Sequence, residues 1–485
     1  MPSIKKNFLY SSFLTTANYI FPLLTFPYVS RVLGVTNIGI CNFVDSIINY
    51  FIIFSMMGVN TVGIREVAAC KGDKQKLSEV FSGLFWLNTI TTIGALIILA
   101  VSVLTVEQLR VHWEMMTVGA VKLVTNYMLV EWLYRGLEQF KFITIRTIIV
   151  KMVYVVCVFV FVRQQNDMLV YYMLTALMVA ANAFINIIYS KHYVTLFVRG
   201  VKFRQYLRHF LFLGVYVLLT KMYTTFNITY LGFVAGETEV GYYTTASKFF
   251  SILIALFSAF TGVMLPRMSS FLSEGKVDEF RYYLSKSVEI LFWFSVPVAI
   301  LAMVYAPVII RIVAGAGYEG AVFPMRIIMP LMMIIGYEQI IIVQGLMPLK
   351  QDKSILRNSI LGALSGIILN IALVSSFKSV GSSVVWIVSE IVVLISAQCS
   401  IKKSIDVRFP WRNFLKTIGL NMPLLVFVLC IFIYVNNHIL SVVMTCVFCV
   451  VYEIILLRFA PNEIVSKEID KLFEKLAVFR GRVSD

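Results

Sequence analysis

The hexapeptide GVTNIG at residues 34–39 has a near-copy, GETEVG, at residues 236–241. Both read Gly, any residue, Thr, any residue, a β-branched apolar residue and Gly, and they begin 202 positions apart. Glycine is typical of tight turns because it adopts backbone angles that other residues avoid. Two matching turns at this separation indicate an internal repeat, which the rest of the chain can test.

The composition is that of a multi-pass membrane protein. Of the 485 residues, 59% are hydrophobic and only 14% are charged, whereas about 25% are charged in soluble proteins. Apolar runs of about 20 residues recur along the chain, the length that crosses roughly 30 Å of hydrocarbon. Lys5 and Lys6 precede the first run, and no clear small-residue cleavage site follows it. We therefore expect this run to stay as the first span.

Fourteen transmembrane helices are predicted. Their ranges are 8–29, 39–60, 80–104, 111–134, 143–162, 168–190, 209–232, 241–264, 284–306, 321–346, 355–376, 380–400, 413–435 and 438–458. With the N-terminus in the cytoplasm, 32 of the 42 Lys and Arg residues lie at cytoplasmic segments and six at outer ones. Basic residues favour the cytoplasmic side, so both termini are predicted to be cytoplasmic. This spread over eight short segments argues against nucleic-acid binding, despite a net charge of +16.

Two further pairs of anchors support the repeat. Arg65 and Arg267 are again 202 apart, and GLEQFK at 136–141 matches GLMPLK at 345–350. We predict two six-helix lobes related by an axis along the membrane normal, which face a central cavity and rock to give alternating access. The predicted divisions are an N-lobe at 1–190, a cytoplasmic linker at 191–208, a C-lobe at 209–400, extra helices at 413–458 and a cytoplasmic tail at 459–485. The spacing of apolar and basic residues in the tail suits either an interfacial helix or a solvated segment.

Several segments, in order, resemble one family of membrane proteins. They are NYIFPLLTFPYVSRVLG at 18–34, GIREVA at 63–68, EWLYRGLEQFKFITIR at 131–146, VGYYTTASK at 240–248, LPRMSSF at 265–271 and LNIALV at 369–374. These closely resemble bacterial polysaccharide repeat-unit flippases, the Wzx-type O-antigen and capsule flippases of the multidrug/oligosaccharidyl-lipid/polysaccharide (MOP) exporter superfamily. The resemblance implies a MATE-like fold in the bacterial inner membrane. It implies transfer of an undecaprenyl-diphosphate-linked oligosaccharide to the outer leaflet for lipopolysaccharide or capsule synthesis.

Such a substrate needs a wet cavity with cations, because moving an ion into a low-dielectric medium costs on the order of tens of kcal/mol before relaxation. Four lysines lie within predicted spans: Lys122, Lys151, Lys221 and Lys248. Intramembrane lysines usually face a cavity or a partner. We expect Lys122 and Lys221 to bind the diphosphate in the lumen. The alternative is structural pairing with Asp45, Glu338 or Glu390, and for Lys151 and Lys248 snorkelling to an interface is as good an explanation.

Each of the other charged residues has a candidate functional role and an ordinary structural alternative. Asp45 and Lys248 occupy nearly equivalent places in the two lobes and could pair as an outer gate. Arg31 could meet the departing diphosphate, although an ordinary interfacial arginine is the plainer interpretation. Glu131, Glu338 and Glu390 are candidates for ion coupling, with capping or ion pairing as the plainer role.

The sequence was also compared with other functional classes, namely metal or nucleotide enzymes, other transporters and membrane-bound enzymes. The four histidines lie near span ends in no ligand spacing, and no phosphate-binding glycine loop appears, so we expect no metal site, no cofactor and no catalytic residues. A multidrug or cation exporter or a peptidoglycan-precursor flippase of the same superfamily remains an alternative. An integral-membrane polymerase or acyltransferase is disfavoured by the lack of substantial loops. Membrane lipids are expected partners, and association with a polysaccharide polymerase or a chain-length regulator is left open.

Overall fold

A computed structural model of the chain describes residues 4–197, 214 and 225–459, and within these residues the regular structure is entirely helical. The chain divides into two compact units. The first contains the described residues up to Ile252, together with Ile310–Pro324 and Ser359–Ser389. The second contains Leu253–Ile309, Met325–Asn358 and the described residues from Glu390 onward.

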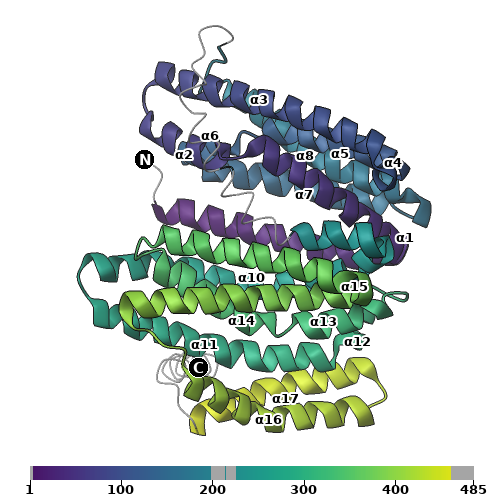
Figure 1. Ribbon diagram of the computed structural model, residues 1–485, viewed down its shortest axis with the longest axis vertical. Coiled ribbons are helices and arrows are strands. Elements are labelled where there is room, and N and C mark those ends of the chain that lie inside the picture. Colours follow the sequence, from purple (N-terminus) through teal and green to yellow (C-terminus); the bar gives the residue numbers. More distant parts are fainter. Residues whose placement is uncertain (1–3, 198–213, 215–224, 460–485) are drawn as a thin grey trace, which may run out of the picture. The chain divides into compact units, whose positions relative to one another are not determined.

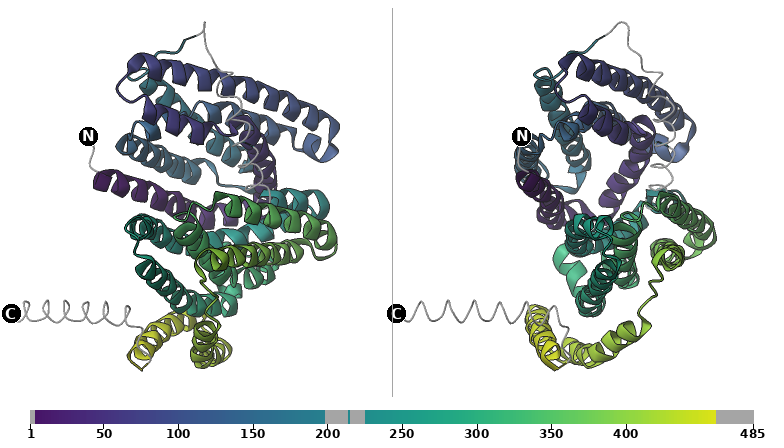
Figure 2. Two further views of the ribbon diagram at one scale, coloured as in Figure 1. Left: turned by 60° about the vertical axis from the view of Figure 1, so that its left-hand side comes forward. Right: turned by 90° about the vertical axis from the view of Figure 1, so that its left-hand side faces the viewer.

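The first unit is built mainly from helices that run alongside one another (Figures 1 and 2). They are α1 (Ile4–Met56), α2 (Val59–Ala69), α3 (Lys74–Thr105), α4 (Glu107–Val111), α5 (Trp113–Tyr127), α6 (Glu131–Gly136), α7 (Phe140–Phe161), the short helix η1 (Gln165–Asp167) and α8 (Met168–Ser190). A further helix covers Thr225–Ala235 and precedes α10 (Glu237–Ser273). Helix α1 packs against α3, α5 and α7, and α8 packs against α5 and α7.

The later helices follow in chain order. They are α11 (Val277–Val304), α12 (Ala306–Val313), η2 (Glu319–Ala321), α13 (Val322–Ile328), α14 (Leu331–Gln339), the π-helix η3 (Ile340–Leu346), α15 (Asp352–Ile405), α16 (Trp411–Tyr434) and α17 (His438–Phe459). In the second unit α11 packs against α14 and α16, and α16 pairs with α17. Phe280, Leu284, Leu291 and Tyr337 belong to its main apolar core.

The predicted fold class, an all-α polytopic membrane protein, is confirmed. Among the described residues, eight helices are long and apolar enough to cross a membrane, and a bent pair forms a ninth. The two longest are Phe13–Ala69, which joins α1 and α2 and has 57 residues, and α15, which has 54. The 54 residues of α15 measure about 80 Å along the helix, enough to cross a membrane twice. Helix α1 breaks at Gly34 and α15 at Lys378, where the backbone leaves helical angles. The predicted helix at 209–232 and the predicted tail lie largely outside the described residues.

The turn after α2 shows how the sequence sets a helix end. Gly72 has a φ of +102°, a left-handed conformation that suits glycine. Asp73 then caps α3, since its carboxylate accepts hydrogen bonds from the backbone N–H groups of Lys76 at 3.0 Å and Gln75 at 3.1 Å. These hydrogen bonds to the charged form lower the pKa of Asp73.

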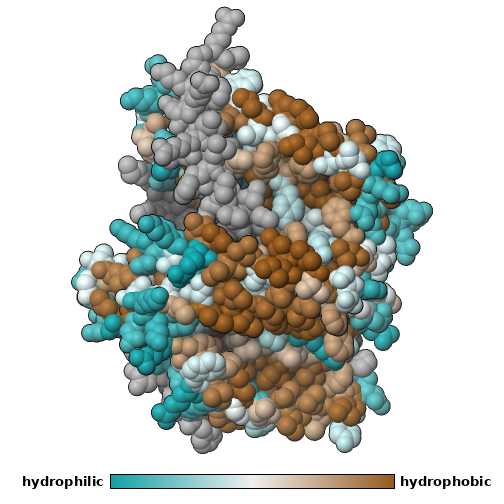
Figure 3. Space-filling model, viewed as in Figure 1, coloured by the Kyte–Doolittle hydropathy of each residue, from teal (hydrophilic) through white to brown (hydrophobic). Residues whose placement is uncertain are grey.

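Exposed apolar side chains lie along the middles of the helices. On the face shown in Figure 3, hydrophobic side chains gather over the central stretches of helices such as α3 and α15, and hydrophilic ones gather at helix ends. Ile97 of α3 is 60% exposed, Val156 of α7 is 61% exposed and Ile368 of α15 is 64% exposed. In water this surface would be unfavourable, whereas hydrocarbon is its natural solvent.

The predicted orientation of α7 and α8 can be tested by thiol labelling. We expect a single cysteine at Lys191, exposed just after α8, to be protected from an impermeant reagent in intact cells, and one at Asn166, exposed in η1, to react. The native cysteines are replaced first, and labelling after cell lysis controls for intrinsic reactivity. Reaction at 191 with protection at 166 would contradict the orientation derived from Lys and Arg.

Candidate translocation site

The two copies of the repeated turn lie against each other in the first unit. Gly34 has a φ of +77° and Gly236 a φ of +87°, so both copies place glycine at a positive φ that other residues rarely adopt. The hydroxyl groups of Thr36 and Thr238 are 2.9 Å apart, and these residues are separated by 202 positions. The side chain of Asn42 likewise donates to Thr244 Oγ1 at 3.2 Å, again with a separation of 202.

The closest approach involves the second glycine of each copy. A Cβ atom on Gly39 would lie 1.7 Å from the carbonyl oxygen of Glu237, and one on Gly241 would lie 2.3 Å from that of Val35. Val35 and Glu237 are themselves equivalent positions in the repeat. The contact is therefore reciprocal, as at a two-fold axis, and the absence of two side chains allows the helices to meet.

A half-buried ion pair lies further along α1. Lys122 Nζ of α5 forms an ion pair and hydrogen bond with Asp45 Oδ1 of α1. Tyr172 of α8 donates its hydroxyl hydrogen to the same carboxylate oxygen at 3.4 Å, and its ring centroid lies 4.7 Å from Lys122 Nζ. The Lys122 side chain is only 12% exposed, while that of Asp45 is 38% exposed. The lysine is thus held from two sides, and the carboxylate remains accessible.

Lys248 of α10 lies near the same pair. Its Nζ is 4.6 Å from the ring centroid of Phe26 in α1, and it interacts electrostatically with Asp45. The structure therefore gathers three of the charged residues selected from the sequence, Asp45, Lys122 and Lys248, around α1. We call this group the α1 charge cluster. It places two cations and one carboxylate together, an arrangement suited to an anionic ligand that competes with the carboxylate.

The remaining basic candidates are placed separately. Lys151 Nζ donates to Asn18 Oδ1 at 2.6 Å and lies 5.8 Å from the ring centroid of Phe21. Arg31 donates to the carbonyl oxygens of Pro27, at 3.2 Å, and Ile312. Lys221 lies outside the described residues.

The three acidic candidates have different partners. Glu131 at the start of α6 forms ion pairs with Arg146 at 3.3 Å and Arg135 at 3.4 Å. In the second unit, Glu338 and Glu390 interact with each other, and Glu338 Oε2 is buried without a hydrogen-bond partner among the described residues. Across the described residues, no group of three His, Cys, Asp or Glu side chains is arranged to hold a metal ion.

Sequence reasoning missed the neutral partners of these charges. Tyr172 contacts Lys122, and Phe26 contacts Lys248. In the sequence, an aromatic residue in an apolar helix cannot be told from a lipid-facing one, because the contact depends on how the helices pack. Glu239 was also missed, and it accepts a hydrogen bond from the Ser379 hydroxyl. The available signal was its position inside the repeated hexapeptide, where Asn37 is the equivalent residue of the first copy.

Comparison with known sequences finds one family model and related proteins that match this chain. A family model described as "Polysaccharide biosynthesis protein" matches residues 4–272. A protein of Escherichia coli (strain K12) named "Putative O-antigen transporter" is 26% identical over 400 residues, which cover 81% of this chain and 95% of that protein.

Comparison with solved structures identifies the fold. The chain is similar to the lipid II flippase MurJ in an inward closed conformation, with a TM-score of 0.74, 14% identity and coverage of 93% of this chain and 99% of the other. It is also similar to an outward-facing multidrug resistance MATE family transporter of the MOP superfamily, with a TM-score of 0.51, 14% identity and coverage of 83% and 96%. The MATE-like, MOP-type fold expected from the sequence is confirmed.

Proposed function

Because the chain belongs to the family of polysaccharide biosynthesis proteins, we propose that it is a flippase for undecaprenyl-diphosphate-linked oligosaccharide repeat units. It moves them from the inner to the outer leaflet of the bacterial plasma membrane by alternating access, for synthesis of O-antigen or a related polysaccharide. Both termini are then cytoplasmic. The chain acts as a transporter rather than an enzyme, which agrees with the name of the Escherichia coli relative.

The observation that carries the proposal is the α1 charge cluster within a chain of this family. A diphosphate cannot enter hydrocarbon without a large desolvation cost, so a carrier must supply cations on its path. Lys122 and Lys248 supply two, and Asp45 holds the first of them in place. A lysine ammonium suits this role as a compact charge on a flexible stem that can follow a moving ligand.

In the proposed mechanism, the diphosphate and Asp45 compete for Lys122. When the carrier is empty, the carboxylate neutralises the ammonium. When the substrate enters, its phosphate oxygens replace the carboxylate as hydrogen-bond acceptors, and the ring of Tyr172 keeps the ammonium oriented. When the substrate leaves, Asp45 binds the lysine again. The two neighbouring carboxyl groups of Glu338 and Glu390 are the candidates for coupling this cycle to a proton.

Deletion of the gene tests the direction of transport. We expect single lipid-linked repeat units to accumulate on the inner leaflet, because the step between their synthesis and polymerisation is lost. The measurement is the accessibility of the units to a glycan-specific reagent in spheroplasts before and after permeabilisation, with a complemented strain as control. Units that reach the outer leaflet but remain unpolymerised would favour a polymerase instead. Accumulation of peptidoglycan precursor would favour the precursor flippase.

A further inference from the structure

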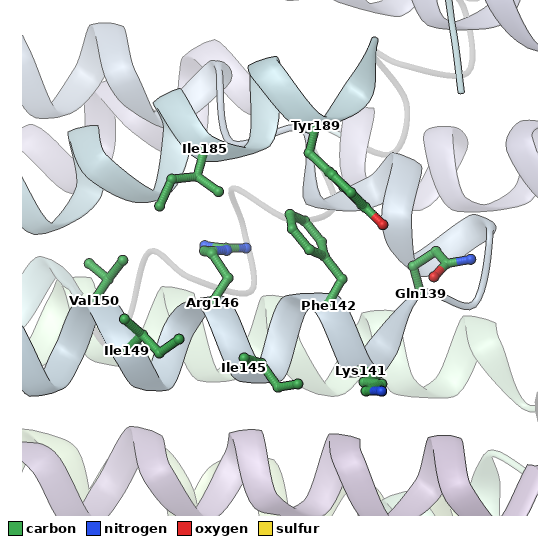
Figure 4. A pocket seen from close by; sticks show the side chains of 9 residues that line it. All are labelled: Gln139, Lys141, Phe142, Ile145, Arg146, Ile149, Val150, Ile185 and Tyr189. Carbon is green, nitrogen blue, oxygen red and sulfur yellow. The ribbon is translucent and has the colours of Figure 1, made fainter. Parts of the chain in front are cut away.

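A crevice of about 460 Å³ lies between α7 and α8 in the first unit. Figure 4 shows Arg146 and Phe142 pointing from α7 toward α8, with Ile185 and Tyr189 pointing back from α8. Of the residues that line it, Gln139, Lys141 and Tyr189 lie toward one end, and Ile149, Val150 and Ile185 lie toward the other. The crevice therefore has a polar end and an aliphatic end.

An incompletely satisfied arginine, Arg146, lies between the polar and the aliphatic side chains of the crevice (Figure 4). Arg146 is only 5% exposed, with Nη1 donating to Asn182 at 2.6 Å and Nη2 donating to Glu131 at 3.3 Å. Its Nε has no acceptor among the described residues. A buried donor without a partner is rare in folded proteins and indicates a missing acceptor. Lys141 adds an exposed cation five residues, or about 1.4 helical turns, away, and within the described part of the chain it forms no ion pair.

The other end of the crevice opens on the lipid-facing side of α7. Ile145 is 45% exposed and Ile149 is 56% exposed, and the apolar stripe continues through Met152 at 57% and Val156 at 61%. Ile185 of α8, 37% exposed, forms the opposite edge. These side chains extend from the polar end of the crevice toward the middle of α7. A ligand bound here would therefore place its polar part at Arg146 and its apolar part along the hydrocarbon-facing stripe.

We propose that this crevice binds one anionic phospholipid of the surrounding leaflet. The phosphate accepts hydrogen bonds from Arg146 Nε and Lys141, and one acyl chain lies along Ile145, Ile149 and Ile185. Basic pockets between transmembrane helices at the cytoplasmic side suit anionic head groups, and the excess of basic residues predicts this end of α7 to be cytoplasmic. The transported lipid fits less well, because its sugars require a hydrated compartment and this crevice faces hydrocarbon.

Native mass spectrometry of the full chain in detergent tests the site. Phosphatidylglycerol is titrated against phosphatidylcholine, and we expect one phosphatidylglycerol to be retained in preference. Lys141→Gln removes one surface cation and should weaken that binding by about fivefold. Ile185→Trp, at the exposed edge, should fill the crevice and abolish it. Lys191→Gln is the matched control, since Lys191 is an exposed lysine at the same end of α8 that does not line the crevice. Neither crevice substitution replaces a member of the Arg146 to Glu131 ion pair.

Three results would overturn the proposal. Equal retention of the two lipids would mean that the crevice does not recognise charge. Equal losses in Lys141→Gln and Lys191→Gln would attribute the binding to general surface charge. Displacement of phosphatidylglycerol by stoichiometric undecaprenyl phosphate would assign the crevice to the transported lipid instead. None of these measurements depends on transport, so the outcome is independent of the proposed flippase function.

Discussion

Replacing Lys122 with alanine is expected to lower export of repeat units by about ten- to hundredfold, with the protein still present in the membrane. A hydrogen bond to a charged group contributes about 1.5–3 kcal/mol, which corresponds to that range. Lys122→Arg should retain part of the activity because it keeps the charge. Lys122→Glu should be the most damaging, since it repels both the diphosphate and Asp45. The measurement is outer-leaflet repeat units per unit of membrane protein.

The structure supplies a control that separates binding from mere pairing. In the double variant Asp45→Lys/Lys122→Asp, the ion pair is kept but the cation moves from α5 to α1. If Lys122 only stabilises the fold, Lys122→Ala lowers protein abundance, and the exchanged pair restores both abundance and export. If Lys122 binds the substrate, the exchanged pair restores abundance alone. Normal export by Lys122→Ala at normal abundance would end the proposal. The same alanine, arginine and glutamate series applies to Lys221.

Much of the fold could be predicted from the sequence because hydrophobic length and basic flanks are local signals. The predicted helix at 168–190 has the bounds of α8. The predicted helices at 80–104, 143–162, 241–264 and 284–306 fall on α3, α7, α10 and α11. The break in the predicted helix 111–134 was missed. There Val130 has a φ of +38° between α5 and α6, and it is 1% exposed. Valine is not a typical turn residue, so the sequence did not indicate a turn at Val130, whose packing in the interior stabilises this conformation.

The site was predicted less completely because partners depend on how helices are rotated. Lys122 was selected as an intramembrane lysine, and three acidic residues were open as its partners. Only placement of α5 beside α1 selects Asp45, which lies 77 residues away. By contrast, the repeat offset of 202 did carry spatial information. It identifies residues that are equivalent about an axis, and near such an axis equivalent residues touch, as Thr36 and Thr238 do.

Replacing Gly241 with alanine is expected to separate the two copies of the repeated turn. The new Cβ would lie 2.3 Å from the carbonyl oxygen of Val35, a backbone atom that cannot rotate away. Overpacking of this kind costs about 1–3 kcal/mol. Because the cost falls only on the conformation in which the turns touch, it shifts the equilibrium toward the separated one by about five- to 150-fold. A carrier that must close on this side in every cycle then loses most of its export.

Native Cys41 reports the separation directly. It lies two residues after Gly39 and is 5% exposed, so with the other cysteines replaced it should resist an impermeant thiol reagent and become reactive in Gly241→Ala. Gly262→Ala is the matched control on the same helix, since nothing lies within 4 Å of its new Cβ. It should leave Cys41 protected, which would exclude a general effect of alanine in α10.

The reciprocity of the contact sharpens this prediction. Gly39→Ala, whose Cβ meets the carbonyl oxygen of Glu237, should reproduce the exposure of Cys41 and the loss of export. The double variant should be little worse than either single one, because turns that have already separated have no second clash to relieve. Independent, additive effects would instead mean that each glycine acts within its own helix. The two turns would then be neighbours without forming a common gate.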